Sequence, residues 1–238
     1  MARQVSIGPG HWVYQAGYPQ FAGSYGIAVY DRDDRSELLL TAAHVIGGLA
    51  PMNQNGLPCD VFAGLGRAGG SLDEPIGQLL RSEPICGIDE VTMDASVIQP
   101  DPGVKLGRRV RTGNAVRRIR DIDCEPVGTE VIVYKRGATQ NHLTSGLLAV
   151  KSVDADITCR IGLHKHETTT RAYFDGYWIE GTDPHAFARD GDSGSIVVDE
   201  YDRLVGMVVA VTGDGNAPGD RAFCIPIARV LDALNVDP

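Results

Sequence analysis

The sequence lacks features that are typical of disulfide-rich, zinc-binding, secreted and membrane-spanning proteins. Its cysteines are odd in number, widely spaced and without a Cys-x-x-Cys pair, so neither a disulfide framework nor a zinc knuckle is expected. They are Cys59, Cys86, Cys124, Cys159 and Cys224. No signal peptide is visible after Met1, and no apolar run approaches the ~18 residues of a membrane span. We therefore expect a cytoplasmic protein with free thiols and no membrane partner.

An excess of basic residues is also missing. Lys and Arg number 22 against 31 Asp and Glu, which gives a net charge of -9. Nucleic-acid phosphates attract positive charge, so nucleic acid is not an expected partner. Glycine, by contrast, is abundant, with 29 of 238 residues. This richness exceeds the usual share of about 7% and favours short strands joined by many turns.

Short β-forming runs recur along the chain, and we expect an all-β fold with a short C-terminal helix. Runs bounded by turn residues at such spacing are typical of barrels or sandwiches. The helix is predicted after Pro226, where apolar residues recur at helical spacing. The expected strands span residues 24–30, 37–41, 59–64, 76–80, 91–98, 130–135, 147–150, 156–161, 171–174, 194–198, 204–212 and 222–225.

The segment Gly191-Asp192-Ser193-Gly194 carries the first candidate chemistry. Glycines allow a tight turn and bring backbone N–H groups close to a ligand. A serine hydroxyl and N–H groups aimed at one carbonyl supply what acyl transfer needs, a nucleophile and an oxyanion hole. Gly, Asp and Ser are also ordinary turn residues, so the segment alone leaves both interpretations open.

A base and an orienting acid are found upstream. His44 ends a predicted buried strand and enters a tight turn, from which its ring can reach across a cleft. Asp94 has a partly apolar setting, in which an unpaired carboxylate is costly. Taken singly, a core histidine and a strand-start aspartate are the plainer interpretations. The order His44, Asp94, Ser193, with spacings of 50 and 99 residues, makes the three a candidate catalytic set.

At these residues the sequence resembles the chymotrypsin/trypsin-like serine proteases, most closely their disulfide-poor bacterial branch. The resemblance covers roughly residues 24–235. It is carried by Thr41-Ala42-Ala43-His44, Met93-Asp94-Ala95-Ser96, the Gly191–Gly194 loop, the Lys-x-Gly…Thr-x-Gly turn of residues 135–146, the strand 206–209 and the segment 223–227.

The resemblance implies two antiparallel six-stranded β-barrels with the active site between them. The N-terminal barrel would span residues 1–110, an interbarrel linker 111–127, and the second barrel with the closing helix 128–238. Ser193 would attack a peptide carbonyl to form an acyl-enzyme, His44 would transfer the proton, and Asp94 would orient the imidazole. The N–H groups of Gly191 and Ser193 would form the oxyanion hole. Neither a cofactor nor a metal is expected.

The same resemblance bears on specificity and activation. Phe187 takes the position at the base of the primary pocket, and Val208 a wall position where glutamate-selective relatives carry a histidine. With Ala210, these residues suggest that a small or apolar substrate side chain is accepted. The zymogen-like string Val45-Ile46-Gly47-Gly48 directly follows His44, so cleavage there would split the triad. We therefore hypothesise that Asp192 pairs with something other than a new N-terminus.

The leading interpretation is a serine endopeptidase that acts on protein or peptide substrates and is restrained by a regulatory protein partner. The alternative is a latent or inactive protease-fold module that only binds peptides. An esterase is less favoured, because no Gly-x-Ser-x-Gly elbow occurs. A local basic cluster is either a solvated linker or a docking site for an acidic partner. It comprises Arg108, Arg109, Arg111, Arg117, Arg118 and Arg120.

Overall fold

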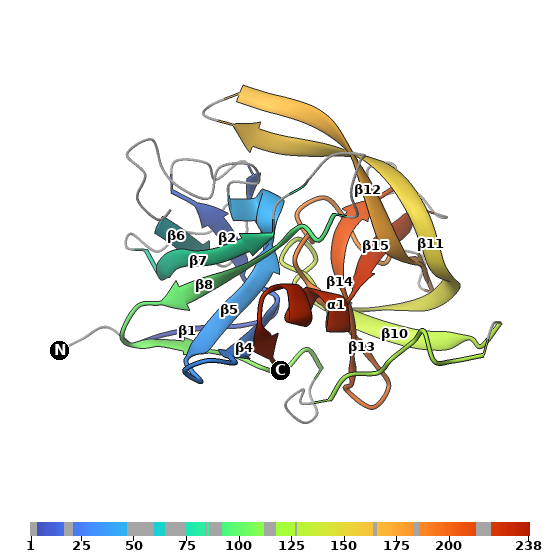
Figure 1. Ribbon diagram of the computed structural model, residues 1–238, viewed down its shortest axis with the longest axis horizontal. Helices are drawn as coiled ribbons and strands as arrows, with labels where there is room; N and C mark the ends of the chain where they lie inside the picture. Colours follow the sequence, from blue (N-terminus) through green and yellow to red (C-terminus); the bar gives the residue numbers. More distant parts are fainter. Residues whose placement is uncertain are drawn as a thin grey trace.

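Most of the regular structure in the computed structural model is β-strand, and the strands form two halves that lie side by side (Figure 1). Blue and green strands form the N-terminal half, and yellow to red strands form the C-terminal half (Figure 1). The structure describes residues 4–16, 21–46, 60–64, 75–83, 85, 92–111, 118–126, 128–163, 166–182, 186–212 and 220–238.

Six strands of the C-terminal half close into a barrel whose neighbouring strands all run antiparallel. Along β10, Val131, Val133 and Lys135 are buried and Ile132 is exposed, which is the alternation of a barrel wall. Barrel closure leaves no unpaired sheet edge. The barrel order is β10 (Val131–Arg136), β11 (Leu143–Leu163), β12 (His166–Gly181), β15 (Arg221–Pro226), β14 (Leu204–Val211) and β13 (Ile196–Asp199).

The N-terminal half is an antiparallel sheet of eight strands. A separate parallel pair joins β1 (Val5–Ile7) to β9 (Val104–Leu106). The order in the sheet is β16 (Val236–Asp237), β4 (Ile27–Asp31), β5 (Glu37–Ala42), β8 (Ala95–Pro100), β7 (Gly77–Glu83), β6 (Asp60–Gly64), β2 (Trp12–Gln15) and β3 (Gly23–Ser24).

The predicted all-β two-barrel fold is confirmed, with a difference in the first half. There the structure has an eight-stranded sheet in place of a six-stranded barrel. One extra strand arises because the run 24–30 is interrupted by Tyr25 and Gly26, which separates β3 from β4. The other is β16, which returns from the C-terminal end to pair with β4. The predicted domain boundaries stay a prediction.

The C-terminal helix is also confirmed. Helix α1 (Ile227–Ala233) follows Pro226 at its N-cap and buries Ile227, Val230 and Leu231. It packs near β14 and β16, between the two halves (Figure 1). Among the described residues, no helix is long and apolar enough to cross a membrane.

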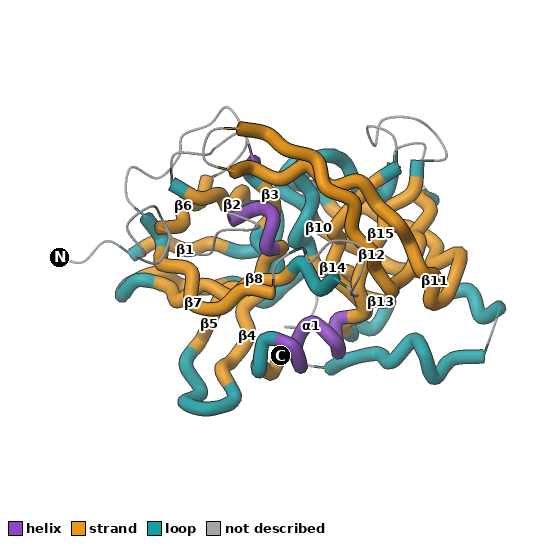
Figure 2. Tube along the Cα trace, turned by 45° about the horizontal axis from the view of Figure 1, so that its top comes forward, coloured by secondary structure: helices purple, strands orange, loops and turns teal. Residues whose placement is uncertain are grey.

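Strands β11 and β12 are longer than the sequence suggests. The expected runs 147–150, 156–161 and 171–174 merge into one hairpin, paired from Gly146 and Gly181 out to Leu163 and His166. Figure 2 shows the outer part of this hairpin reaching over the N-terminal half, as does Figure 1. The N–H of Thr92 donates to the carbonyl of Tyr173 at 2.8 Å, which ties the hairpin to the segment before Asp94.

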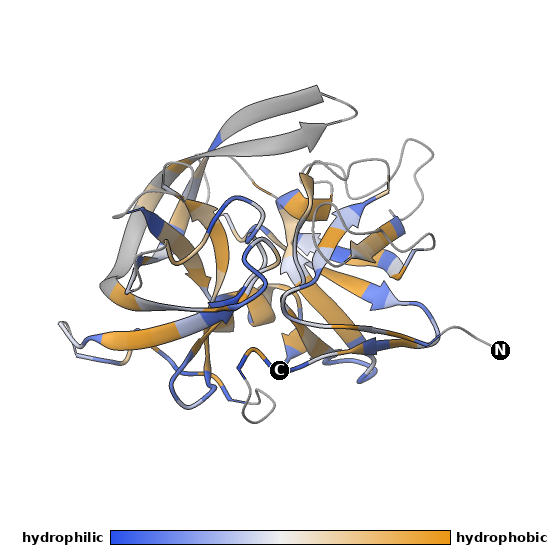
Figure 3. Ribbon diagram, turned by 180° about the vertical axis from the view of Figure 1, so that it is seen from behind, coloured by the Kyte–Doolittle hydropathy of each residue, from blue (hydrophilic) through white to orange (hydrophobic). Residues whose placement is uncertain are grey.

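Hydrophobic residues fill the strands around the centre of the molecule, and hydrophilic residues gather at the turns (Figure 3). The largest core cluster contains residues of both halves, such as Leu40 and Val97 from the first and Phe174 and Ile225 from the second. Burial of such side chains stabilises the fold by roughly 1.5–3 kcal/mol each. The shared core fixes the halves against each other, and the candidate site lies where they meet.

Candidate active site

His44 and Asp94 meet at the end of strand β5. The chain leaves the sheet in a 3₁₀ turn, η2 (Ala43–Ile46), that carries His44. The imidazole Nδ1 lies 2.6 Å from Asp94 Oδ2, and the His44 N–H donates to Oδ1 at 2.8 Å. The N–H of Ala43 also donates to the Asp94 carbonyl at 3.1 Å. These contacts fix the ring relative to the carboxylate and leave Nε2 facing away from it.

Asp94 adopts a backbone conformation that non-glycine residues rarely take. Its φ is 43°, in the left-handed region. Such a conformation costs on the order of 1–3 kcal/mol and persists only where surrounding contacts impose it. Here the contacts with Ala43 and His44 impose it, and they bring a wholly buried carboxylate under the imidazole.

The environment of His44 favours the protonated ring. Burial lowers its pKa, but the charge of Asp94 and its hydrogen bond raise it, as does the charge of Asp190. The net effect is a pKa above the ordinary 6.5. The imidazole is thus a stronger base than a free histidine, and its protonated form is stabilised by a buried anion.

Ser193 lies on a tight turn between two glycines with positive φ, 90° at Gly191 and 89° at Gly194. The turn packs against the segments that carry His44. A Cβ at Gly23 would meet Val45 at 2.2 Å and the Ser193 carbonyl at 2.8 Å, so Ser193 and the neighbour of His44 contact the same glycine. The structure therefore brings the loop of Ser193 beside the turn of His44.

The hydroxyl of Ser193 is half-buried and donates to the carbonyl of Val209 at 3.5 Å. In the described part of the chain, it is not hydrogen-bonded to His44. Bonds between a nucleophile and its base are often long before substrate binds, so this arrangement is compatible with proton transfer after a small rotation of the side chain.

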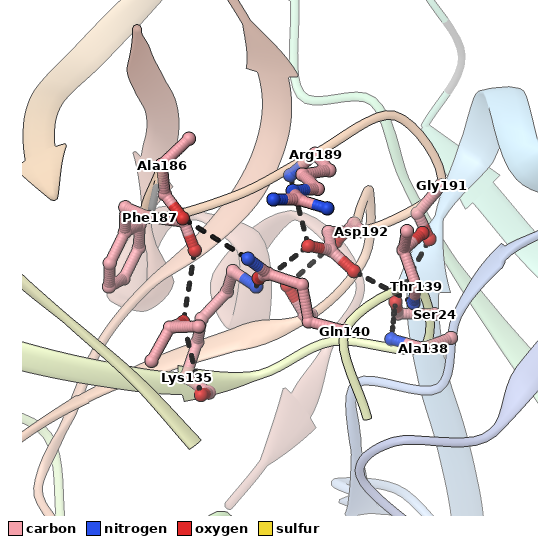
Figure 4. A network of polar contacts seen from close by, with 12 residues as sticks. Ser24, Lys135, Ala138, Thr139, Gln140, Ala186, Phe187, Arg189, Gly191 and Asp192 are labelled. Atoms are coloured by element: carbon pink, nitrogen blue, oxygen red, sulfur yellow. Dashed lines mark hydrogen bonds and ion pairs between the residues drawn. The ribbon is translucent and has the colours of Figure 1, made fainter. Parts of the chain in front are cut away.

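A buried ion pair lies beneath the serine loop (Figure 4). Lys135 Nζ lies 2.8 Å from Asp192 Oδ2, and both side chains are fully buried. The backbone N–H groups of Thr139 and Arg189 each donate to the Asp192 carboxylate at 3.0 Å. A Cβ at Gly137 would lie 2.1 Å from Asp192 Oδ1, so only glycine admits the carboxylate there. Burial lowers the pKa of Lys135, and the charge of Asp192 opposes that effect.

Asp192 therefore pairs with an internal lysine, in agreement with the hypothesis that its partner is not a new N-terminus. The partner itself was not predicted. Lys135 occupies an inward position of the alternating strand Val131–Arg136, next to Val133. A lysine at such a position needs a buried acid, and that signal could have identified the pair.

The three predicted pocket residues differ in how far they are buried. Phe187 and Val208 belong to the inner hydrophobic cluster of the C-terminal barrel and are almost wholly buried. Ala210 is partly exposed and packs against the other core cluster. The carbonyl of Phe187 accepts a hydrogen bond from the Thr144 hydroxyl at 2.9 Å, which anchors the segment that leads to Ser193.

Several arginines of the basic cluster contact other residues of the same chain. Arg108 lies 4.0 Å from the ring centroid of Tyr30, and Arg111 donates to the carbonyl of Glu200 at 2.6 Å. Arg120 pairs with Glu125 at 3.0 Å and contacts the buried Asp199. These contacts favour a structural role over a docking site; Arg117 lies outside the described residues. Among the described residues, no group of three candidate metal ligands occurs.

Comparisons with known proteins agree on one family. The family model described as Trypsin matches residues 34–234. A glutamic acid-specific serine protease that uses a histidine triad in substrate binding has 16% identity and a TM-score of 0.58, over 97% of this chain and 98% of that one. The chymotrypsin of Cellulomonas bogoriensis has the same identity and TM-score, over 98% and 97%. No curated protein matches the sequence.

Proposed function

Because this chain belongs to the trypsin family of serine proteases, we propose that it is an endopeptidase whose triad is His44, Asp94 and Ser193. The observation that carries the proposal is the 2.6 Å contact between His44 Nδ1 and the buried Asp94 carboxylate, beside the Gly191–Gly194 turn that bears Ser193. The trypsin-like fold supports serine peptidase activity, and the proposal assigns that activity to these three residues.

In the proposed reaction, Ser193 Oγ attacks the scissile carbonyl while His44 Nε2 accepts its proton. The C–O bond that forms gives a tetrahedral oxyanion, which the N–H groups of Gly191 and Ser193 stabilise. His44 then protonates the leaving amine as the C–N bond breaks and leaves an acyl-enzyme. Water, deprotonated by His44, then attacks the acyl carbonyl; the bond to Ser193 Oγ breaks, His44 returns the proton to Ser193 Oγ, and the acid leaves. Asp94 keeps the Nδ1 proton in place and stabilises the imidazolium throughout.

A fluorophosphonate probe tests this proposal without knowledge of the substrate. We expect stoichiometric labelling at Ser193, located by mass spectrometry of the digest, and no labelling of Ser193→Ala. Ser195→Ala should still reach stoichiometric labelling, even if more slowly, because it removes a neighbouring hydroxyl and leaves the nucleophile intact. Complete absence of labelling in the folded wild-type chain would instead support the alternative, a peptide-binding module without turnover.

We further propose that the primary pocket accepts a small or apolar side chain. The side chains of Phe187 and Val208 are apolar, and neither is an acid that would select Lys or Arg. The similar glutamic acid-specific protease uses histidines in substrate binding, whereas Val208 offers no imidazole. Profiling of a peptide library tests this, and cleavage restricted to sites after basic or acidic residues contradicts it.

We also propose that the enzyme works in a reducing, intracellular compartment under the control of a protein partner. The buried Cys224 is a free thiol, and the internal Lys135–Asp192 pair supports activity without processing. Activity should therefore survive strong reducing agents, and its loss would count against that compartment. Full, unregulated turnover by the isolated chain in cell extract would count against the partner.

A further inference from the structure

The two oxyanion-hole donors belong to peptide groups that could rotate. The Gly191 N–H is part of the peptide that joins it to Asp190, and the Ser193 N–H is part of the peptide that joins it to Asp192. Glycine has no Cβ to hinder rotation of its flanking peptides, so the Gly191 N–H in particular can turn away from the substrate. Among the hydrogen bonds of the described residues, neither N–H has a protein acceptor that would hold it in place.

Both peptides are nevertheless held, by their opposite edges. In a trans peptide the C=O and N–H point in opposite directions, so fixing the oxygen also fixes the hydrogen. The Thr139 hydroxyl donates to the Asp190 carbonyl at 2.7 Å. The Ser195 hydroxyl donates to the Asp192 carbonyl at 2.6 Å, and the Ser195 N–H reaches the same oxygen at 3.0 Å.

From these contacts we propose that Thr139 and Ser195 are positioning residues for catalysis, which aim the two oxyanion donors through the carbonyls of Asp190 and Asp192. The inference rests on the proposed function of the Ser193 loop. A hydroxyl that donates to an amide oxygen also polarises that amide, which strengthens the hydrogen bond given by its N–H. The two residues thus hold and strengthen both donors without touching the substrate.

The surroundings of the two hydroxyls support this role. Ser195 is fully buried, and its hydroxyl has no solvent to bond instead. Thr139 is anchored by its own N–H, which donates to Asp192 Oδ1 at 3.0 Å (Figure 4). A Cβ at Gly191 would lie 2.7 Å from Thr139 Oγ1 and 2.4 Å from the Trp12 ring, so the chain closes tightly around the peptide that Thr139 holds.

The test measures the second-order rate constant for labelling of Ser193 by a fluorophosphonate, whose phosphonyl oxygen occupies the oxyanion hole. Loss of an oxyanion donor costs about 10²–10³-fold. Removal of either hydroxyl leaves the oxyanion donor present but less firmly oriented. The labelling rate constant should therefore fall by less, about tenfold for Ser195→Ala and about tenfold for Thr139→Val. The double variant should be slower than either single variant, but the two losses are not expected to multiply, because Thr139 and Ser195 both contact Asp192. Thr139→Ser keeps the hydroxyl and should restore the rate.

Tyr25→Phe is the matched control, because the buried Tyr25 hydroxyl also donates to a backbone carbonyl, that of Gly107, at 2.8 Å. It should alter the melting temperature without altering the labelling rate. With a peptide ester, Thr139→Val and Ser195→Ala should lower kcat and leave KM nearly unchanged. The pH at which labelling is half-maximal should also stay unchanged, since His44 is untouched.

The outcomes separate the two proposals. A wild-type chain that is not labelled overturns the proposed function and this inference with it. A labelled wild type with unchanged rates in either folded variant overturns the inference alone, as does a Tyr25→Phe loss of the same size. Should Thr139→Val fail to fold, Ser195→Ala carries the test, because it removes one oxygen from a buried site without adding bulk.

Discussion

Replacing Lys135 by methionine tests the buried ion pair under the serine loop. The exchange keeps an unbranched side chain of similar length but leaves the Asp192 carboxylate, fully buried, without its cation. Removing one partner of a buried pair costs about 3–5 kcal/mol. For a chain of this size each kcal/mol lowers the melting temperature by about 2–4 °C. We therefore expect calorimetry to show a fall of about 6–20 °C.

The double variant Lys135→Met/Asp192→Asn decides the cause. Asparagine at residue 192 carries no charge, so no unpaired charge remains buried and most of the lost stability should return. Labelling of Ser193 should nevertheless stay slow. Lys105→Met is the control, because Lys105 is an exposed strand lysine whose contact with Gln4 is a long 3.4 Å. An unchanged melting temperature in Lys135→Met would contradict the stabilising role of the ion pair. A loss of stability that Asp192→Asn does not relieve would contradict it as well.

Four further results are expected. The rate of ester hydrolysis should rise with pH through a midpoint above 6.5, because the neutral ring of His44 is the base and Asp94 raises its pKa. Asp94→Asn should lower that midpoint and reduce kcat, and the same exchange in another member of this family costs about 10⁴-fold. His44 should stabilise the fold most fully below pH 6.5 and lose this contribution as pH rises through its raised pKa, which urea unfolding of Ser193→Ala can measure. Exposed Cys124 should react with a thiol reagent in the native protein, whereas buried Cys224 should react only after unfolding, since burial raises its pKa; equal rates for both would contradict this.

The sequence was informative where local pattern determines local structure. Three consecutive leucines, Leu38, Leu39 and Leu40, form the buried middle of the strand Glu37–Ala42, and His44 follows in the predicted turn. The full length of the β11–β12 hairpin was missed, because its outer part has no third strand as a partner among the described residues and its polar residues resemble those of loops. The return of Val236 to strand β4 is a contact of high sequence separation that no local pattern records.

The candidate site, like the fold, could be predicted from the sequence only in part. Short motifs identified His44, Asp94 and Ser193, because the chemistry requires those residue types. Lys135 and Thr139 sit in a turn that the resemblance already singled out, but their partners, Asp192 and the Asp190 carbonyl, lie over 50 residues away. Which donor meets which acceptor depends on how the 135–140 turn packs under the serine loop, and only the folded chain reveals it.

The pairing of β16 with β4 has a consequence for protein synthesis. The sheet that bears His44 and Asp94 gains its edge strand from Val236 and Asp237, which the ribosome adds more than 40 residues after Ser193. Arg32 bonds to Asp237 at 2.9 Å across the same seam. In a nascent chain halted before this point, β4 therefore lacks its β16 partner, and the sheet that leads to His44 and Asp94 is one strand short.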